Sequence, residues 1–268
     1  MISYCATLDV PRQSATALAK LLSRHRRALG TRRLTRALTP WAQAVLILRW
    51  YRDATRIKNL ARDAAIALAT AYRYVHEGID ALASQAPDLH QVIADAAKAG
   101  MECLLLDGTL IAIDRVNDPD RTVDRWYSGS RAHHGANVQV LASPAGWPLW
   151  TSPVEPGSTH DLTCARRHAL PALYPAAVRG LPVLADKGYT GSGAGIRVPV
   201  RRQRGGRELA PATLGWNAYI NAHRAPVERA IAVLKVGWKA LEHVSLCPQR
   251  IGAIVAAALV LTRWEKSY

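Results

Sequence analysis

The hydrophobic positions of residues 101–268 switch between strand-like and helix-like spacing. Three apolar, β-rich runs separated by turn-forming residues come first and predict an antiparallel meander at 104–116, 137–142 and 149–154. The remaining pattern predicts helices at 160–173, 227–241 and 249–264, with strands at 182–185 and 196–200. This order predicts a mixed α/β domain in which a mixed sheet is flanked by helices.

Residues 38–86 have helical spacing and predict a small all-α unit of three helices. Thr39-Pro40 is typical of a helix start, and short second and third helices follow it. In the third helix, apolar residues at 4-3-4 spacing would face a core: Leu68, Tyr72, Val75 and Ile79. The outer face would then carry Thr70, Arg73, Tyr74 and His76. Such a helix resembles the last helix of a helix-turn-helix, which enters the major groove of DNA, although three short helices are also common as plain structure.

The chain is strongly basic, with 35 Lys+Arg against 20 Asp+Glu and a formal net charge of +15 over 268 residues. Residues 1–37 form a basic, helix-like segment whose single acid is Asp9, and a loop predicted at 197–207 holds five arginines with only Glu208 beside it. Such an excess favours a polyanionic partner, with DNA the natural one. The alternative for the whole chain is an arginine-rich composition that reflects no polyanionic partner. The alternative for residues 1–37 is a basic helix face that contacts only solvent.

Nothing in the sequence predicts export or membrane insertion. The first residues lack the charged and apolar regions of a signal peptide, and the longest apolar stretch, 251–262, is too short to span a bilayer. Cysteines at 5, 103, 164 and 247 form neither a zinc pattern nor a disulfide framework. We therefore expect a cytoplasmic, nucleoid-associated protein without a membrane partner.

Two aspartates follow apolar, strand-like runs. Asp107 comes after three leucines and precedes Gly108-Thr109, and Asp186 ends a second buried run. A single aspartate at a strand end is usually a helix cap or a turn former. If the two strands are parallel neighbours, however, the carboxylates lie side by side, as divalent-metal ligands for phosphodiester cleavage must.

A third carboxylate, Glu228, has Arg224 four positions before it and Lys235 seven after it. These offsets place the three side chains on one helical face, where a metal ligand would lie beside phosphate-binding cations. Pro226 predicts a helix start or a kink, which would put Arg224 just outside that helix. Asp161 is a rival second ligand, but it opens a predicted helix and is better interpreted as a cap or an outer partner of the ligands. His160 is not favoured as a catalytic group.

These motifs resemble those of the DDE-superfamily transposases of bacterial insertion sequences, in the insertion-sequence five-like group allied to Harbinger-type transposases. Leu-Leu-Leu-Asp107-Gly-Thr and Leu-Ala-Asp186-Lys-Gly-Tyr are similar to the first two catalytic segments. Arg224, Glu228 and Lys235 match a tyrosine–arginine–glutamate–lysine signature, in which Asn221 replaces the tyrosine. The resemblance covers nearly the whole chain and, with the element order, implies a ribonuclease H-like catalytic domain over 87–268.

The resemblance implies a transposase that binds terminal inverted repeats, self-associates on DNA, cuts with Mg²⁺ or Mn²⁺, and joins the freed 3′-hydroxyls to target DNA. Asp107, Asp186 and Glu228 would hold the metal, and Arg224 and Lys235 would hold phosphates or flanking DNA. Further DNA contacts would come from Thr70, Arg73, Tyr74, Arg201, Arg202 and Arg204. The alternatives are a nuclease of this fold without strand transfer and a DNA-binding protein that has lost catalysis; the presence of all three carboxylates argues against the second.

Overall fold

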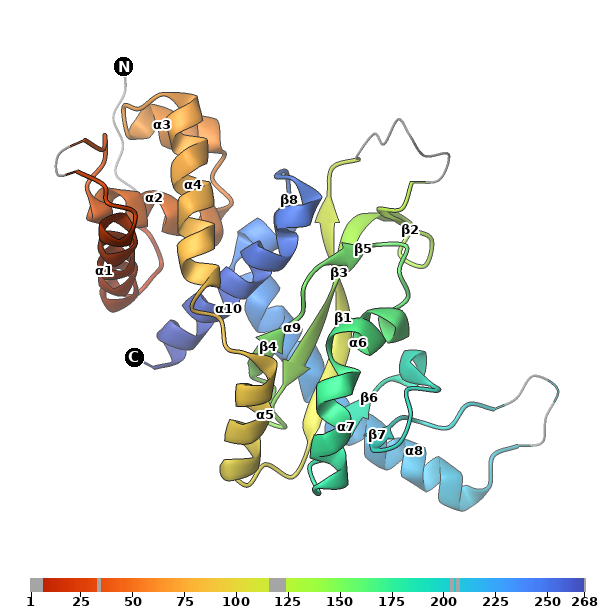
Figure 1. Ribbon diagram of the computed structural model, residues 1–268. Coiled ribbons are helices and arrows are strands. Elements are labelled where there is room, and N and C mark those ends of the chain that lie inside the picture. Colours follow the sequence, from red (N-terminus) through yellow and green to blue (C-terminus); the bar gives the residue numbers. More distant parts are fainter. Residues whose placement is uncertain (1–6, 33–34, 116–123, 203–204, 206–207, 268) are drawn as a thin grey trace. The chain divides into compact units, whose positions relative to one another are not determined.

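The chain forms two compact units in a computed structural model that describes residues 7–32, 35–115, 124–202, 205 and 208–267 (Figure 1). A helical unit comprises Met1–Ala86, Lys235–Glu242 and Ala253–Tyr268, and an α/β unit comprises Pro87–Leu234 and His243–Gly252. The predicted α/β domain with an all-helical amino-terminal unit is confirmed.

The amino-terminal helices of the helical unit are α1 (Arg12–Ala28), α2 (Pro40–Asp53), α3 (Ile57–Asp63) and α4 (Leu68–Ala83). Thr39 caps α2 by accepting a hydrogen bond from the Ala42 amide at 3.1 Å, as the Thr-Pro start predicts. The carboxy-terminal segments contribute η2 (Lys239–Leu241) and most of α10 (Ile251–Lys266). They join the amino-terminal helices because the Tyr51 hydroxyl donates to the Ile254 carbonyl at 3.2 Å and the Arg52 guanidinium lies 4.2 Å from the Trp238 ring centroid.

The prediction that Tyr74 faces outward from α4 is wrong. Its side chain is 2 % exposed, and its hydroxyl accepts a hydrogen bond from the Leu38 amide at 3.2 Å. Leu68 and Tyr72, predicted to face inward, are instead 45 % and 41 % exposed. The inner face uses small residues, because a Cβ on Gly78 would lie 2.2 Å from the Ile47 Cδ1 atom of α2. Close helix packing therefore decides the orientation of α4, which leaves Leu68 and Tyr72 outside although Val75 and Ile79 are buried as predicted.

Two arginines of the basic amino-terminal region also point into the helical unit. Arg36 forms a two-pronged ion pair with Glu77 at 3.0 and 3.1 Å, and Arg26 donates to the Gln43 Oε1 atom at 2.6 Å. Burial lowers the pKa of Arg26 from its usual value. These two side chains therefore support the position of Tyr74, whose ring centroid lies 5.9 Å from each guanidinium.

The sheet of the α/β unit has the order β2-β3-β1-β6-β7, with β4 and β5 also paired to β3 and β8 paired to β1. Its long strands are β1 (Leu104–Ile113) and β3 (His133–Ala142), which are antiparallel, and β4 (Pro148–Thr151) continues the meander. Strand β6 (Val183–Ala185) is parallel to β1, and β7 (Ile196–Arg197) is parallel to β6 at the edge. The short strands are β2 (Tyr127–Ser128), β5 (Glu155–Pro156) and β8 (His243–Val244).

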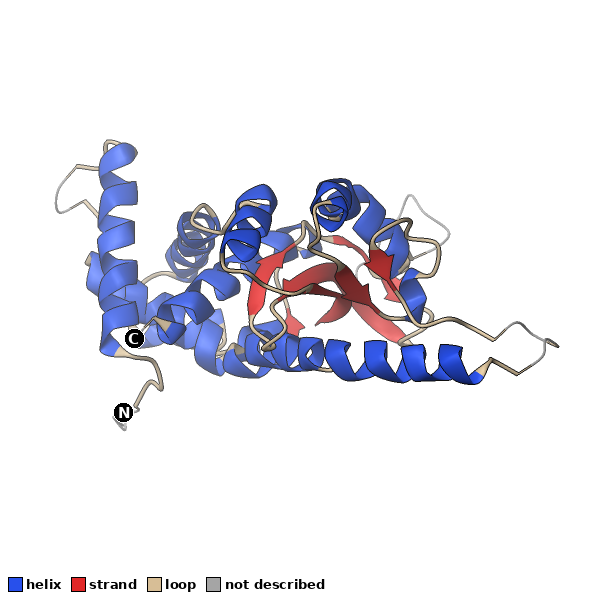
Figure 2. Ribbon diagram, turned by 90° about the horizontal axis from the view of Figure 1, so that it is seen from below, coloured by secondary structure: helices blue, strands red, loops and turns tan. Residues whose placement is uncertain are grey.

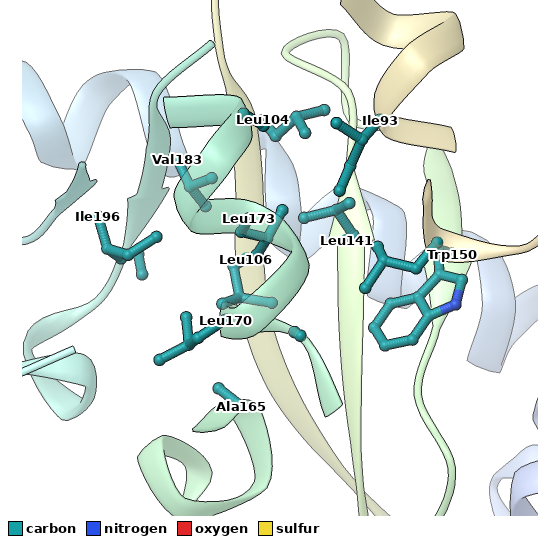
Figure 3. Close-up of a cluster of buried hydrophobic side chains, with 14 of the residues drawn as sticks. Ile93, Leu104, Leu106, Leu141, Trp150, Ala165, Leu170, Leu173, Val183 and Ile196 are labelled. Carbon is teal, nitrogen blue, oxygen red and sulfur yellow. The ribbon is translucent and has the colours of Figure 1, made fainter. Parts of the chain in front are cut away.

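Helices cover both faces of the sheet (Figure 2). On one face, α5 (Leu89–Lys98), α6 (Asp161–His168) and α7 (Leu170–Val178) enclose a core that includes Ile93, Leu106, Leu141, Leu170 and Leu173 (Figure 3). On the other face, α8 (Pro211–Arg224) and α9 (Pro226–Gly237) pack through Ile220, Val227 and Ala230 against Leu105, Ala142 and Leu184. Successive leucines of β1 thus point to opposite layers, as the alternation of side chains along a strand requires.

The helix boundaries differ from the sequence-based prediction in three places. The helix predicted at 160–173 is two helices, α6 and α7, and the one predicted at 227–241 ends at Gly237 before the 3₁₀ turn η2. Helices α5 and α8 were not predicted as separate elements. Among the described residues, each helix falls short of the length or the apolar character that a membrane span requires.

Candidate active site

The sheet brings Asp107 and Asp186 together. Strands β1 and β6 are parallel with Leu106 opposite Ala185, so the next residues in register are the two aspartates. The Asp107 Oδ1 atom accepts a hydrogen bond from the Gly108 amide at 2.9 Å. Asp186 caps the 3₁₀ turn η1 (Lys187–Tyr189), where its Oδ1 atom accepts from the Gly188 amide at 2.6 Å. Each carboxylate is therefore held by the backbone that follows it.

The environment of Asp107 opposes its ionisation. Its pKa is raised to about 6, mainly by burial and in smaller part by the nearby negative charges of Asp186 and Asp161, against the lowering effect of the Gly108 amide and Arg224. A half-buried carboxylate beside another acid is costly unless a cation compensates the charge. This arrangement therefore favours a divalent cation at the Asp107–Asp186 pair.

Asp161 approaches β1 from the opposite face. A Cβ on Gly108 would lie 2.4 Å from the Asp161 Oδ1 atom, so only glycine leaves room for this carboxylate. Because neighbouring strand residues point to opposite faces, the Asp107 side chain is directed away from Asp161. Gly108 therefore lies between the candidate ligands Asp107 and Asp186 and the alternative ligand Asp161.

A chain of polar side chains holds Asp161 in place. The Asn137 Nδ2 atom donates to the Asp161 Oδ1 atom at 2.5 Å, and the Gln139 Nε2 atom donates to the Asn137 Oδ1 atom at 3.1 Å. The buried Tyr189 hydroxyl then donates to the Gln139 Oε1 atom at 2.6 Å.

The prediction of Asp161 as a helix cap is wrong, because His160 caps α6 by accepting from the Leu162 amide at 3.2 Å. Asp161 is instead the first helical residue and ends a polar chain that joins α6, β3 and η1.

A polar pocket of about 320 Å³ opens beside Asp161. Its lining includes Gly108, Ser128, Ser130, Arg131, Asn137 and Asp161. Serine hydroxyls and an arginine can bind phosphate or sugar oxygens, whereas the Asp161 carboxylate disfavours an anion directly beside it. This face of β1 can therefore accept a polar, oxygen-rich group at some distance from Asp161.

The helix start predicted at Pro226 is confirmed, so Arg224 lies outside the helix that carries Glu228 and the Arg-Glu-Lys face is not continuous. Arg224 is the last residue of α8, Ala225 caps that helix, and α9 begins at Pro226, which cannot donate the backbone hydrogen bond needed inside a helix. The half-buried Arg224 guanidinium lies close enough to Asp107 to lower the pKa of that carboxyl. Its Nε atom is buried without a hydrogen-bond partner among the described residues.

Glu228 is exposed in the first turn of α9, and Lys235 lies seven residues further along the same helix. Among the parts of the chain that the structure describes, no three His, Cys, Asp or Glu side chains gather closely enough to hold one metal ion. The structure therefore brings together Asp107 and Asp186, with Asp161 on the opposite face of β1, and does not place Glu228 with them. The pair still fits Mg²⁺, which is commonly bound by one or two carboxylates together with substrate phosphates and water.

A family model described as DDE superfamily endonuclease matches residues 106–263, more than half of the chain. The chain belongs to this endonuclease family. No curated protein and no solved structure matches the chain significantly. The matched range contains both aspartates and Glu228, and family membership supports a nuclease or transposase type of function with DNA as the substrate.

The positions predicted to bind DNA in this DDE-superfamily endonuclease are distributed over both units. Arg73 is exposed on α4 and donates to the Thr70 Oγ1 atom at 3.1 Å, so these two side chains share a surface. Arg201 and Arg202 are exposed after β7, and Arg204 lies outside the described residues. The segment before them is fixed to α8, because the Asn217 side chain exchanges hydrogen bonds of 2.8 and 3.0 Å with the Val200 backbone.

Proposed function

We propose that this endonuclease is a transposase that binds the terminal inverted repeats of its element, cuts at the element ends, and joins the freed 3′-hydroxyls to target DNA. The observation that carries the proposal is the pairing of Asp107 and Asp186 on neighbouring parallel strands, within reach of the Arg224 charge. Family membership supports the nuclease chemistry, and the net charge of +15 suits a DNA substrate.

Asp107 and Asp186 would hold a divalent cation, and we assign Glu228 as the third carboxylate, from an exposed position on α9. Bound divalent cations activate the attacking water or hydroxyl and stabilise the leaving oxygen of a phosphodiester. The Arg224 guanidinium, whose Nε atom has no hydrogen-bond partner within the described part of the chain, would hold the negative charge of a DNA phosphate beside Asp107. Lys235 would bind flanking phosphates further along α9. The hydrogen-bonded chain from Asp161 to Tyr189 would hold η1 against β3, the antiparallel neighbour of β1, so that Asp186 stays near Asp107.

The test is to incubate the protein with labelled element ends, an unlabelled target duplex, and either Mg²⁺ or Mn²⁺. We expect both nicked ends and longer, joined products, and no product when the metal is removed with a chelator. Nicking without joined products would instead identify a nuclease without strand transfer. Binding without nicking would identify a DNA-binding protein that has lost catalysis.

Replacing Arg73 with Ala should weaken the preference for terminal-repeat DNA over random DNA. An exposed arginine on a helix in the major groove can make a two-pronged contact with guanine, which contributes about 1–3 kcal/mol of discrimination. The measurement is the ratio of dissociation constants for repeat and random duplexes at one salt concentration. Lys58→Ala, which removes an exposed cation from α3, is the control and should leave this ratio nearly unchanged. An unchanged ratio in Arg73→Ala would remove α4 from base recognition.

Replacing Arg201, Arg202 and Arg204 together with Ala should flatten the salt dependence of DNA binding. Removing one arginine–phosphate interaction reduces the slope of log K against log salt by roughly 0.9, so the triple variant should have a slope smaller by about two to three units. Affinity should fall alike for repeat and random DNA, because phosphate contacts carry no sequence information. The check is a titration of binding at four or more salt concentrations. A slope equal to that of the wild type would assign the phosphate contacts elsewhere.

A further inference from the structure

Helix α8 exposes a stripe of aromatic rings. Ile220 is its single buried residue among those described, whereas Trp216 and Tyr219 are 39 % and 49 % exposed. Trp216, Tyr219 and His223, here called the aromatic stripe, follow i, i+3, i+7 spacing and therefore share one helix face. The ring centroids of Trp216 and Tyr219 are 5.8 Å apart with planes 18° from parallel, and those of Tyr219 and His223 are 3.9 Å apart.

Local contacts hold these rings in place. The His223 Nδ1–H group donates to the Tyr219 carbonyl at 2.8 Å, which fixes the tilt of the imidazole over the phenol ring. Arg197 of the edge strand β7 places its guanidinium 5.9 Å from the Trp216 ring centroid. The two Asn217–Val200 hydrogen bonds join the next helix position to the segment after β7. The rings are therefore positioned in advance and would lose little conformational freedom on binding a ligand.

The stretch of sequence that contains the stripe is basic. Residues 191–227 contain six arginines and a single acidic residue, Glu208. Aromatic rings interleaved with arginines bind single-stranded nucleic acid, because each base offers a π-face to a ring and each phosphate offers a charge to a guanidinium. Inside an intact duplex the base faces are covered by stacking, so such rings select bases that are unpaired.

The stripe also leads toward the candidate ligands. His223 directly precedes Arg224, whose charge acts on Asp107. At 1.5 Å per helical residue, Trp216 and Arg224 are separated by about 12 Å along the axis, or roughly three nucleotides at ~3.4 Å each. Figure 1 shows α8 extending from the sheet region outward past β7. The stripe thus begins beside the candidate active site and runs away from it.

We propose that the aromatic stripe stacks unpaired bases of the DNA strand within about three nucleotides of the bond to be cut. This proposal relies on the proposed function for the position of the cut, whereas base stacking itself needs no catalysis. The distinguishing ligand is therefore a forked duplex with a short unpaired strand, compared with a fully paired duplex of the same sequence.

The experiment measures the binding of both ligands without metal, with 2-aminopurine in the unpaired strand as a fluorescent reporter of stacking. The wild type should quench the reporter and prefer the forked ligand. Trp216→Ala and Tyr219→Ala should each lower the affinity for the forked ligand about tenfold or more and abolish the quenching, with the duplex affinity little changed. Trp216→Phe should retain most of the effect, and Leu214→Ala, which removes an exposed apolar side chain from the same helix, should behave as the wild type.

Equal decreases in affinity for forked and paired ligands would overturn the proposal, as would unchanged quenching in both alanine variants. Sedimentation equilibrium of the same variants tests a second copy of the chain as the occupant. A change in oligomeric state with unaltered DNA binding would assign the stripe to self-association and overturn base stacking. Because these measurements omit metal, a protein that stacks bases but never cleaves would refute the proposed function and the position relative to a cut, and would leave base stacking by the stripe standing.

Discussion

Replacing Asp107 or Asp186 with Asn should reduce DNA cleavage by more than about a hundredfold, since loss of even an outer partner of a metal ligand commonly costs 10–100-fold. Asparagine keeps the shape of the side chain but removes the anionic oxygen that a divalent cation requires. DNA affinity measured without metal should remain close to that of the wild type, because neither carboxylate attracts phosphate. The measurement is the rate of nicking of labelled element ends, alongside equilibrium binding.

The companion variants determine which third carboxylate takes part. Glu228→Gln should abolish cleavage if this exposed side chain completes the metal site on DNA. Asp161→Asn should have a smaller effect, because Asp161 lies against the other face of β1 at Gly108 and is hydrogen-bonded to Asn137 of β3. Wild-type cleavage by Asp186→Asn would make Asp161 the second ligand, and wild-type cleavage by Glu228→Gln would leave the aspartate pair to act with DNA phosphates alone.

The placement of the aspartate pair could be predicted from the sequence because it depends on strands. An apolar run that ends in a charged residue predicts a buried strand, and the charged residue marks where that strand leaves the core. Two such runs in an α/β pattern predict parallel neighbours, and the register of β1 with β6 confirms the adjacency of Asp107 and Asp186. Asn137 and Gln139 carried a similar signal, since two polar residues at i and i+2 in an apolar strand share one face. Their hydrogen bonding to Asp161 depends on the space that Gly108 leaves because it has no side chain. The sequence pattern does not reveal that space.

Helix orientation was harder to predict than strand order. In α4 the apolar pattern favoured Leu68 and Tyr72 as core residues, yet Ala71, Tyr74 and Gly78 are buried instead. Small residues bury little apolar area but allow two helices to approach closely. A hydrophobic pattern does not show the close packing that results. In α8 the difficulty was the opposite one, because a helix with one buried residue has almost no apolar periodicity to detect.

The second large effect concerns stability and pH in the absence of metal. The pKa of Asp107 is raised to about 6 in the folded protein, against the ordinary value of 3.8 in an unfolded chain. The folded state therefore binds this proton more tightly than the unfolded state does. The resulting stabilisation is fully present below the unfolded value and disappears as the pH rises through about 6. Above that pH the buried charge costs at most roughly 3 kcal/mol, because each pKa unit corresponds to about 1.4 kcal/mol.

Asp107→Asn removes this charge and should therefore raise the free energy of unfolding at pH 8 in the presence of a chelator, with a much smaller gain at pH 4. The measurement is urea unfolding of wild type and variant at both pH values. Glu102→Gln, which neutralises an exposed carboxylate in the same unit, should change stability little at either pH. Mg²⁺ should then make the wild type more stable than the variant. A cation that binds only the folded wild type stabilises it by mass action, and it has no such site in the variant. A variant that is less stable than the wild type at pH 8 without metal would show that the carboxylate is already compensated within the protein, and a cation would no longer be needed to explain the Asp107–Asp186 pair.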